Sequence, residues 1–176
     1  MDAFKLARRQ WLAGERVEMS ALARELGVNR VTLYRWVGSR EQLLVEVIWQ
    51  LAEQAMRILD EEAERTGADR VVHSASGLVD VAIVNPGMRY WLAQEGEAAM
   101  RLLTLRESGY QERLAEWFEQ LLREESDDGR LELDADVTDV AYAIVRLMES
   151  YVYTDLITGE QPEAGRAEPV LRMLLR

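Results

Sequence analysis

The sequence contains no cysteine, only three prolines and a single histidine among its 176 residues. Without cysteine there is no disulfide bond, no thiolate metal site and no cysteine nucleophile, and the composition is compatible with a reducing cytoplasm. No apolar run approaches the roughly twenty residues that a membrane-spanning helix needs. The first residues also lack the apolar core of a secretion signal. These absences predict a cytoplasmic protein without a membrane anchor.

The motifs of the common enzyme classes are missing as well. There is no GxSxG elbow, no phosphate-binding loop and no metalloprotease motif. His73 stands alone, and the acidic groups lack the spacing of a calcium loop, so we interpret them as helix caps and solvated helix faces. We therefore expect no catalytic residue, no metal and no cofactor, although composition alone leaves a hydrolase with two carboxylates open.

What the chain has in quantity is helix-forming apolar sequence. Apolar residues make up 48% of the chain, leucine and alanine dominate, and prolines are too few to interrupt long helices. The length suffices for one substantial core or for a small domain fused to a larger one. We predict an all-α protein of about nine helices.

The charge is distributed unevenly along the chain. The net charge is -11, but residues 1–44 carry a net charge of +3 and residues 45–176 carry -14. A basic head on an acidic body is typical of a protein that places one end against phosphates. This division predicts a DNA-binding domain over residues 1–44 and a second domain over residues 45–176.

The basic part contains the local signals of two helices joined by a tight turn. Leu22 and Leu26 fall on one face of a first helix, and Gly27 stops it. Asn29 stands at the N-cap of a second helix over residues 30–37. On that helix we expect Val31, Tyr34 and Val37 to share one face. A helix pair with a short turn containing glycine is the spacing of a major-groove reader.

A third helix is expected to start just after the second. Ser39 is placed to cap it, and Arg40 lies in its first turn. A helix amino terminus beside a guanidinium forms a phosphate-binding corner.

The run from Leu22 to Leu44 resembles the DNA-binding region of the TetR family of bacterial regulators. The matching positions are Leu22-Ala23, Gly27-Val28-Asn29, Thr32-Leu33-Tyr34 and Ser39-Arg40-Glu41. Within the family the wording is similar to the subgroup of quorum-signal-degradation repressors. The sequence departs from the commoner pattern at Asn29-Arg30, which we expect to alter the choice of operator, and at Trp36-Val37, which we expect to alter packing only.

The docking geometry of a helix-turn-helix predicts which side chains reach DNA. Base edges are expected to be read by Asn29, Arg30, Thr32 and Arg35, and phosphates to be contacted by Tyr34 and Arg40. For Arg30 a plain phosphate contact stays open as the alternative.

The resemblance also implies a pocket for a small apolar or amphipathic effector in the helical body, with lactones and related acyl molecules as the first compounds to screen. The aromatic residues proposed to line it are Trp49, Tyr90, Trp91, Trp117, Phe118 and Tyr151. Residue by residue, membership of the ordinary core is the competing interpretation.

Apolar periodicity and breaking residues predict the remaining helices. The expected ranges are residues 3–13, 39–66, 69–84 with Asp69 as the cap, 86–95 with Asn85 as the cap, 97–105, 110–125, 136–158 and 170–175, with a polar loop at 124–130. The helix over 39–66 would belong to both domains.

The helix over 136–158 has apolar residues on more faces than its own core needs, so we expect a partner chain to cover the surplus. The residues proposed for this contact are Val137, Ile144, Met148 and Val152. With the terminal helix it would complete a four-helix bundle across a twofold axis.

Together these features favour a homodimeric, ligand-responsive transcriptional regulator that binds a double-stranded operator and acts as a repressor. An effector in the body would move the helix over 39–66 and thereby change the separation of two recognition helices. The alternative is a helical dimer that acts through protein partners without binding DNA.

Overall fold

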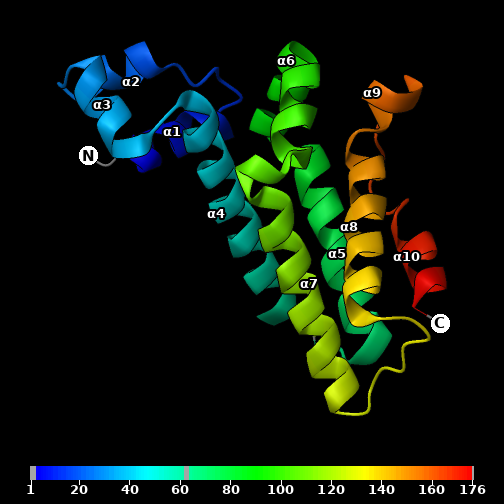
Figure 1. Ribbon diagram of the computed structural model, residues 1–176. Helices are drawn as coiled ribbons and strands as arrows, with labels where there is room; N and C mark the ends of the chain where they lie inside the picture. Colours follow the sequence, from blue (N-terminus) through cyan, green and yellow to red (C-terminus); the bar gives the residue numbers. More distant parts are fainter. Residues whose placement is uncertain (1–2, 62–63, 176) are drawn as a thin grey trace.

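The computed structural model describes residues 3–61 and 64–175, and the regular secondary structure in this part of the chain is all helix, as the sequence predicts. Figure 1 shows residues 3–44 at one end of the molecule, which we call the head, and the remaining helices, which extend from it and which we call the body. The α-helices are α1 Ala3–Leu12, α2 Met19–Glu25, α3 Arg30–Val37, α4 Arg40–Glu61, α5 Gly67–Val84, α6 Pro86–Thr104, α7 Tyr110–Asp127, α8 Val137–Val152, α9 Thr154–Thr158 and α10 Glu168–Leu174, with a 3₁₀ turn η1 at Arg106–Ser108.

The turn between α2 and α3 forms as its local signals predict. Gly27 has a φ of 69°, a conformation that L side chains rarely adopt, and the Val28 N–H donates to the Ala23 carbonyl at 3.0 Å. The Asn29 Oδ1 accepts the Thr32 N–H at 2.8 Å, so Asn29 is the N-cap of α3. These contacts span few residues, which is why sequence alone can identify them.

The start of α4 is capped reciprocally. The Gln42 N–H donates to the Ser39 Oγ at 3.2 Å, and the Ser39 N–H donates to the Gln42 Oε1 at 2.8 Å. This capping box confirms the predicted role of Ser39 and satisfies two amide groups that the helix itself leaves unpaired.

The predicted apolar face of α3 is wrong. Leu33 and Val37, one turn apart, are buried in the head, whereas Val31 is 78% exposed and Tyr34 is 41% exposed. On an eight-residue helix, spacings of three and of four residues both fit an apolar stripe, and packing against α1 and α2 selects the second.

The first body helices differ from prediction at their ends. α4 ends at Glu61, and residues 64–66 are not helical, so the helix is shorter than the predicted 39–66; residues 62–63 lie outside the described part of the chain. α5 begins at Gly67 without a cap from Asp69. The Asp69 carboxylate pairs with Arg172 of α10 instead, because the helix starts two residues earlier than predicted.

Gly96 does not end a helix, contrary to prediction. α6 continues through it from Pro86 to Thr104, with a kink at Glu95, where φ is -135° and ψ is 34°. A Cβ at Gly96 would lie 2.9 Å from a methyl carbon of Leu156, so the glycine allows α9 to pack closely. Asn85 caps α6 as predicted, since its Oδ1 accepts the Met88 N–H at 3.0 Å.

The last part of the chain also departs from the predicted boundaries. α7 continues to Asp127, so the first half of the predicted 124–130 loop is helical. The predicted 136–158 helix is two helices, α8 and α9, which meet at the buried Tyr153.

Two hydrophobic cores share α4. The first joins α1–α3 and the start of α4 to α6, and the second joins the rest of α4 to α5, α7, α8 and α10. The head-side core therefore extends past residue 44 and includes Trp91 and Leu92 of α6.

A buried ion cluster closes the far end of the body. Glu125 of α7 is 0% exposed and accepts from the Gly67 N–H at 2.6 Å, from Arg70 at 2.7 Å and from Arg130 at 2.6 Å. Hydrogen bonds from Arg130 and then Arg70 lower the pKa of Glu125 to about 2, despite its burial. The cluster ties the start of α5 to the end of α7.

We predict a loss of stability in acid that depends on Glu125. Because its pKa is about 2 in the folded chain and about 4.5 ordinarily, the stabilisation is complete above pH 4.5 and is lost as pH falls toward 2. Glu125→Gln should lower the free energy of unfolding at neutral pH by on the order of 3 kcal/mol. Urea unfolding at several pH values measures both effects. Glu116→Gln on the exposed side of α7 is the control, and equal acid sensitivity of wild type and Glu125→Gln would contradict the prediction.

Candidate DNA interface and internal cavity

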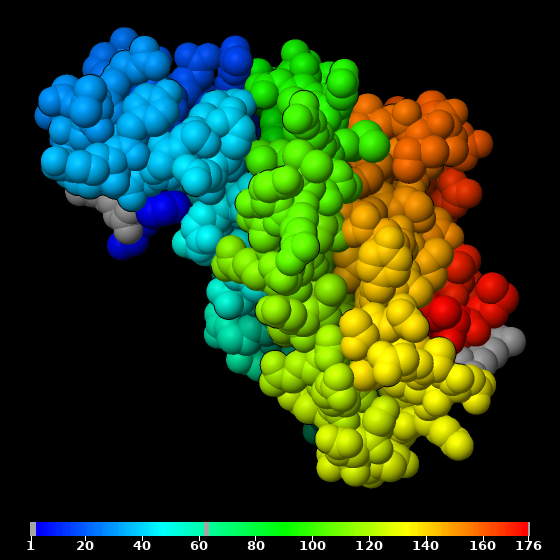
Figure 2. Space-filling model, in the orientation of Figure 1, coloured from blue at the N-terminus to red at the C-terminus, as the bar shows by residue number. Residues whose placement is uncertain are grey.

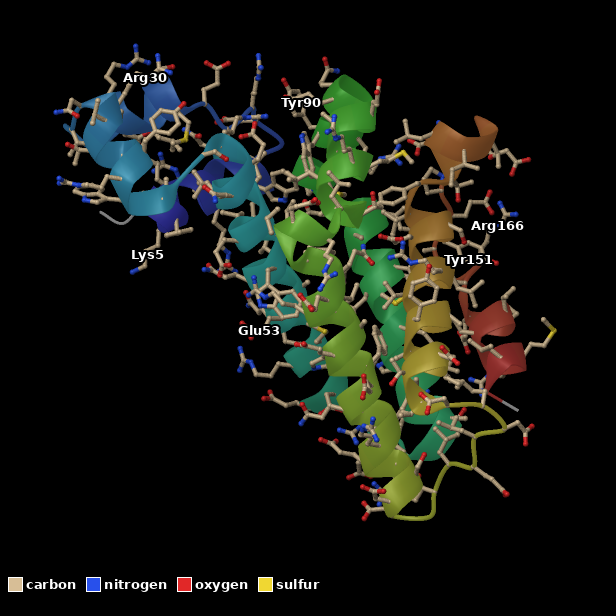
Figure 3. All side chains as sticks on the ribbon, viewed as in Figure 1. Lys5, Arg30, Glu53, Tyr90, Tyr151 and Arg166 are labelled. Carbon is tan, nitrogen blue, oxygen red and sulfur yellow. The ribbon has the colours of Figure 1, made fainter. Side chains whose placement is uncertain are left out.

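The outward face of α3 carries most of the proposed DNA-contacting residues. Arg30, Tyr34 and Arg35 are exposed, and Figure 3 shows Arg30 on the outside of the head, away from the body. The Arg30 guanidinium lies 5.9 Å from the centroid of the Tyr34 ring, so the two side chains form one cationic and aromatic surface. Thr32 is half-buried beside them.

Asn29 has a structural task at the start of this surface. Its side-chain oxygen accepts from the Thr32 N–H, which fixes the orientation of the amide and leaves the NH₂ group exposed. An asparagine that reads adenine uses both its oxygen and its nitrogen. The cap therefore limits the orientations that Asn29 can offer to a base as long as α3 keeps its N-terminus.

Arg40 lies in the head but is bound to the body. Its NH1 and NH2 groups donate to the two Glu95 carboxylate oxygens at 2.8 and 2.9 Å, and its Nε donates to the Val17 carbonyl at 2.8 Å. Arg16 lies 3.5 Å from the same carboxylate. Hydrogen bonds from Arg40 hold the pKa of Glu95 below its ordinary value. Three donors of Arg40 are thus used inside the chain, a role that the sequence did not indicate.

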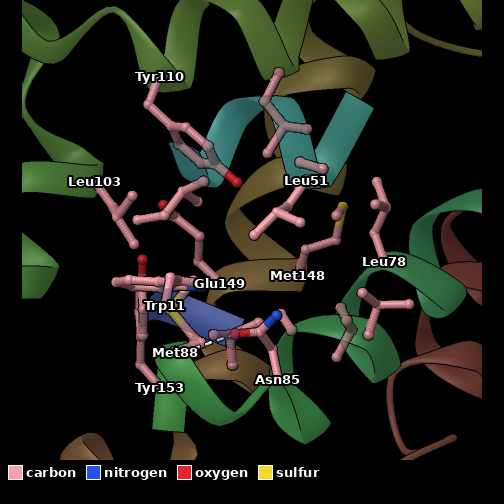
Figure 4. Close-up of a pocket in the computed structure, with 17 residues that line it drawn as sticks. Trp11, Leu51, Leu78, Asn85, Met88, Leu103, Tyr110, Met148, Glu149 and Tyr153 are labelled. Carbon is pink, nitrogen blue, oxygen red and sulfur yellow. Dashed lines mark hydrogen bonds between the residues drawn. The ribbon is translucent and has the colours of Figure 1, made fainter. Parts of the chain in front are cut away.

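A cavity of about 80 Å³, partly open to the surface, lies where the two cores meet (Figure 4). It has room for roughly half a dozen water molecules. Its lining is mostly apolar and comes from six helices: Trp11 of α1; Ile48, Leu51 and Ala52 of α4; Leu78, Val79, Val81 and Ala82 of α5; Met88 and Leu103 of α6; Tyr110 and Leu114 of α7; Met148, Glu149 and Val152 of α8; and the junction residues Asn85 and Tyr153.

Four side chains give the cavity its polar character: Asn85, Tyr110, Glu149 and Tyr153. Glu149 pairs with Arg146 at 2.9 Å and accepts from Gln111, and burial raises its pKa. Burial also raises the pKa of Tyr110 to about 12 and that of Tyr153 well above its usual value. Both phenols therefore keep their protons at neutral pH and can donate hydrogen bonds to a ligand.

The six aromatic residues predicted for effector binding do not line this cavity. Trp91 packs edge-on against Trp11 with ring centroids 5.6 Å apart, Trp49 lies against Tyr110 at 6.2 Å, and Trp117 lies against Phe118 at 4.9 Å. Tyr90 and Tyr151 are half-buried. The aromatic lining comes from Trp11, Tyr110 and Tyr153, because which side of each helix faces the cavity depends on the packing of all six helices.

The predicted dimer residues are only partly at the surface. Ile144 is 0% exposed and Met148 is 5% exposed, so both are covered by the chain's own core, and Met148 lines the cavity. That part of the prediction is wrong, because α5 and α7 pack on the face of α8 that carries both residues. Val137 and Val152 are half-buried. Exposed apolar side chains lie instead on neighbouring positions, including Tyr142 of α8 and Met173 of α10.

Neither a metal site nor a membrane-spanning helix is found in the described residues 3–61 and 64–175. In this part of the chain no group of three or more histidine or acidic residues could hold a metal ion. None of its helices combines the length and the apolar character that crossing a membrane requires.

The sequence and the structure resemble known transcriptional regulators. Residues 66–176 match the family described as tetracyclin repressor-like, C-terminal domain. The structure is similar to the transcriptional repressor QsdR of the TetR family from R. erythropolis, with a TM-score of 0.85, 27% identity, and coverage of 98% of this chain and 92% of that chain. It shares its fold with the regulator FadR from Bacillus subtilis, solved in complex with stearoyl-CoA, with a TM-score of 0.62, 14% identity, and coverage of 98% and 96%. A comparison with curated proteins found no match.

We predict that Glu95 holds the head against the body. Glu95→Gln removes the charge that Arg40 and Arg16 face, so the first turns of α2 and α4 should open more often. Amide hydrogen exchange at Leu22 and Leu43 should accelerate about fivefold, corresponding to about 1 kcal/mol for a partly exposed ion pair. Glu97→Gln, an exposed neighbour on α6, is the control. Unchanged exchange at both amides would rule out this role.

Proposed function

The chain belongs to the TetR family of transcriptional regulators, and we propose that it is a homodimeric repressor released from its DNA operator by a small apolar or amphipathic effector. The observation that carries the proposal is the position of the cavity. One of its walls is Trp11, which belongs to the head, and the opposite walls belong to the body. A molecule in the cavity touches both parts at once.

The size of the cavity supports a switch in which the walls move. About 80 Å³ is small for an acyl molecule of ten or more heavy atoms, and we propose that burying such a molecule here separates the lining helices. α1 and α6 meet at the cavity without spare room, since a Cβ at Gly87 would overlap the Trp11 carbonyl and lie 2.6 Å from a Trp11 ring carbon. Separation of α6 from α4 or α5 is thereby passed to α1.

A second contact passes the same displacement to α4. Glu95 lies at the kink of α6 and holds Arg40 in the first turn of α4, directly after α3. In a dimer the two recognition helices must lie about 34 Å apart to reach successive major grooves. A shift of a few ångströms in α6 and α4 is enough to weaken binding, provided that the effector prefers the shifted state.

The proposed DNA contacts are those on the outward face of the head. Arg30 and Arg35 reach base edges or phosphates, with Tyr34, Thr32 and the amide group of Asn29 beside them. Arg40 can contact a phosphate only after it leaves Glu95. In the structure described here we therefore assign Arg40 the role of passing a displacement of α6 to α4.

For the dimer we propose the side of the body opposite the head, formed by α8 and α10. Figure 2 shows these helices along that edge of the molecule. Tyr142 of α8 is 60% exposed and Met173 of α10 is 64% exposed, and Leu147 and Tyr151 of α8 are half-buried. A second copy would cover these apolar groups and place the heads at opposite ends of the assembly.

Sedimentation equilibrium tests this dimer surface. Met173→Glu should weaken the dimer, and Ile58→Glu on α4, the control, should not. A monomeric wild type that binds DNA would refute the proposed dimer.

The DNA-binding part of the proposal predicts a salt-sensitive, sequence-specific complex. The full-length protein should enrich one sequence from a randomised duplex pool, and its affinity should fall steeply with salt. Arg30→Ala should weaken binding by roughly tenfold or more, relaxing the preference at one base pair if Arg30 reads guanine and lowering the salt slope by about 1 if it contacts phosphate. Arg57→Ala, an exposed arginine on α4, should bind as wild type does. Failure to enrich any sequence, with no salt dependence, would favour a protein-interaction module instead.

The effector part predicts that filling the cavity blocks the response. Ala52 lies in the lining on α4, and Ala52→Leu adds three carbons there. The variant should bind the selected duplex normally, but acyl lactones of increasing chain length should fail to release it from the duplex. In wild type the same lactones should change the tryptophan fluorescence, because Trp11 lines the cavity. Ala93→Leu on the exposed side of α6 is the control, and thermal melting checks for overpacking, which costs about 1–3 kcal/mol. Equal release of both variants by the same lactone would refute the cavity as its site.

A further inference from the structure

The recognition helix α3 exposes an unusual amount of apolar surface. Val31 is 78% exposed, the largest value among the large apolar side chains of residues 3–61 and 64–175, and Trp36 on the same helix is 54% exposed. A β-branched side chain on the solvated face of a short helix adds nothing to helix stability and is poorly solvated. The folding of the head therefore gives no reason for a valine at this position.

The helix geometry places Val31 on the DNA-facing side. Leu33 and Val37 are buried and define the inward face of α3. With 3.6 residues per turn, Val31 and Arg35 lie one turn apart on the opposite face. Val31 also belongs to the first turn, and the first turn of a recognition helix is the part that approaches base edges.

The surroundings of Val31 favour nucleic acid over a protein as its partner. Arg30 precedes it and Arg35 follows one turn later, and the α3 sequence from Arg30 to Val37 contains no acidic residue. Trp36 points about 140° away from Val31 around the helix axis, so the two do not form the single apolar stripe that a partner helix would cover. The two arginines can pair with the phosphates on either side of a DNA groove, while the isolated valine between them faces the bases.

One chemical group in the major groove is apolar, namely the 5-methyl group of thymine. We propose that Val31 packs against a thymine methyl in each operator half-site and is a specificity-determining residue of this protein. The inference rests on the proposed DNA-binding function. It adds that an A·T base pair is recognised next to the contact made by Arg30.

The experiment uses the full-length protein and the duplex that it selects from a randomised pool. Each thymine of one half-site is replaced in turn by deoxyuridine, which removes only the 5-methyl group. We expect one replacement to weaken binding by about fourfold, the factor that burial of one methyl group gives. Val31→Ala should lose a similar factor on the thymine duplex and should bind thymine and deoxyuridine duplexes equally at that position.

Two controls separate this effect from others. Val84→Ala, which shortens a valine that is 71% exposed on α5, should keep the full thymine preference. Circular dichroism melting of Val31→Ala should match wild type, because the side chain makes no core contact. Retention of the fourfold thymine preference by Val31→Ala, or a wild type indifferent to every thymine methyl, would overturn the inference while leaving specific DNA binding intact. If no sequence is selected at all, the proposed function itself fails, and the inference fails with it.

Discussion

The contact between α1 and α6 determines how the head of this protein is held. Trp11 packs edge-on against Trp91, and Gly87 lies so close to Trp11 that no larger residue fits. The Arg40–Glu95 ion pair adds a second, directional contact between α4 and the kink of α6. Because the helix-turn-helix has a small core of its own, its orientation depends on these contacts with the body.

The two ends of the body are held differently. At the far end, Glu125 joins α5, α7 and the following loop through three charge-assisted contacts in a buried position. At the head end, the helices enclose a cavity lined by apolar side chains and by the polar groups of Glu149, Tyr110 and Tyr153. Dispersion contacts around a cavity change with small displacements, whereas a buried ion cluster breaks only at a large free-energy cost. Under the proposed function, an effector in the cavity would move the helices at the head end and leave the far end in place.

Sequence reasoning succeeded where the deciding interactions are local. Gly27, the Asn29 cap and the Ser39 cap each act through contacts within five residues, and each lies where it was predicted. It failed where a residue's environment comes from distant helices. Gly96 allows α9 to pack instead of ending α6, and Ile144 faces the chain's own core instead of a partner. None of the six aromatic residues proposed to bind an effector lines the cavity between the two cores.

The sequence by itself determined the all-α fold and the helix-turn-helix, because apolar periodicity, capping residues and turn glycines are encoded within a few neighbouring positions. The family followed from the resemblance of residues 22–44 to known regulators. Only the tertiary structure decided that Arg40 binds Glu95, that Trp11 of the head lines the cavity, and that Val31 faces outward. Each of these depends on which faces of helices distant in the sequence come together. That choice is made by the packing of complete side chains in two shared cores, which no short segment contains.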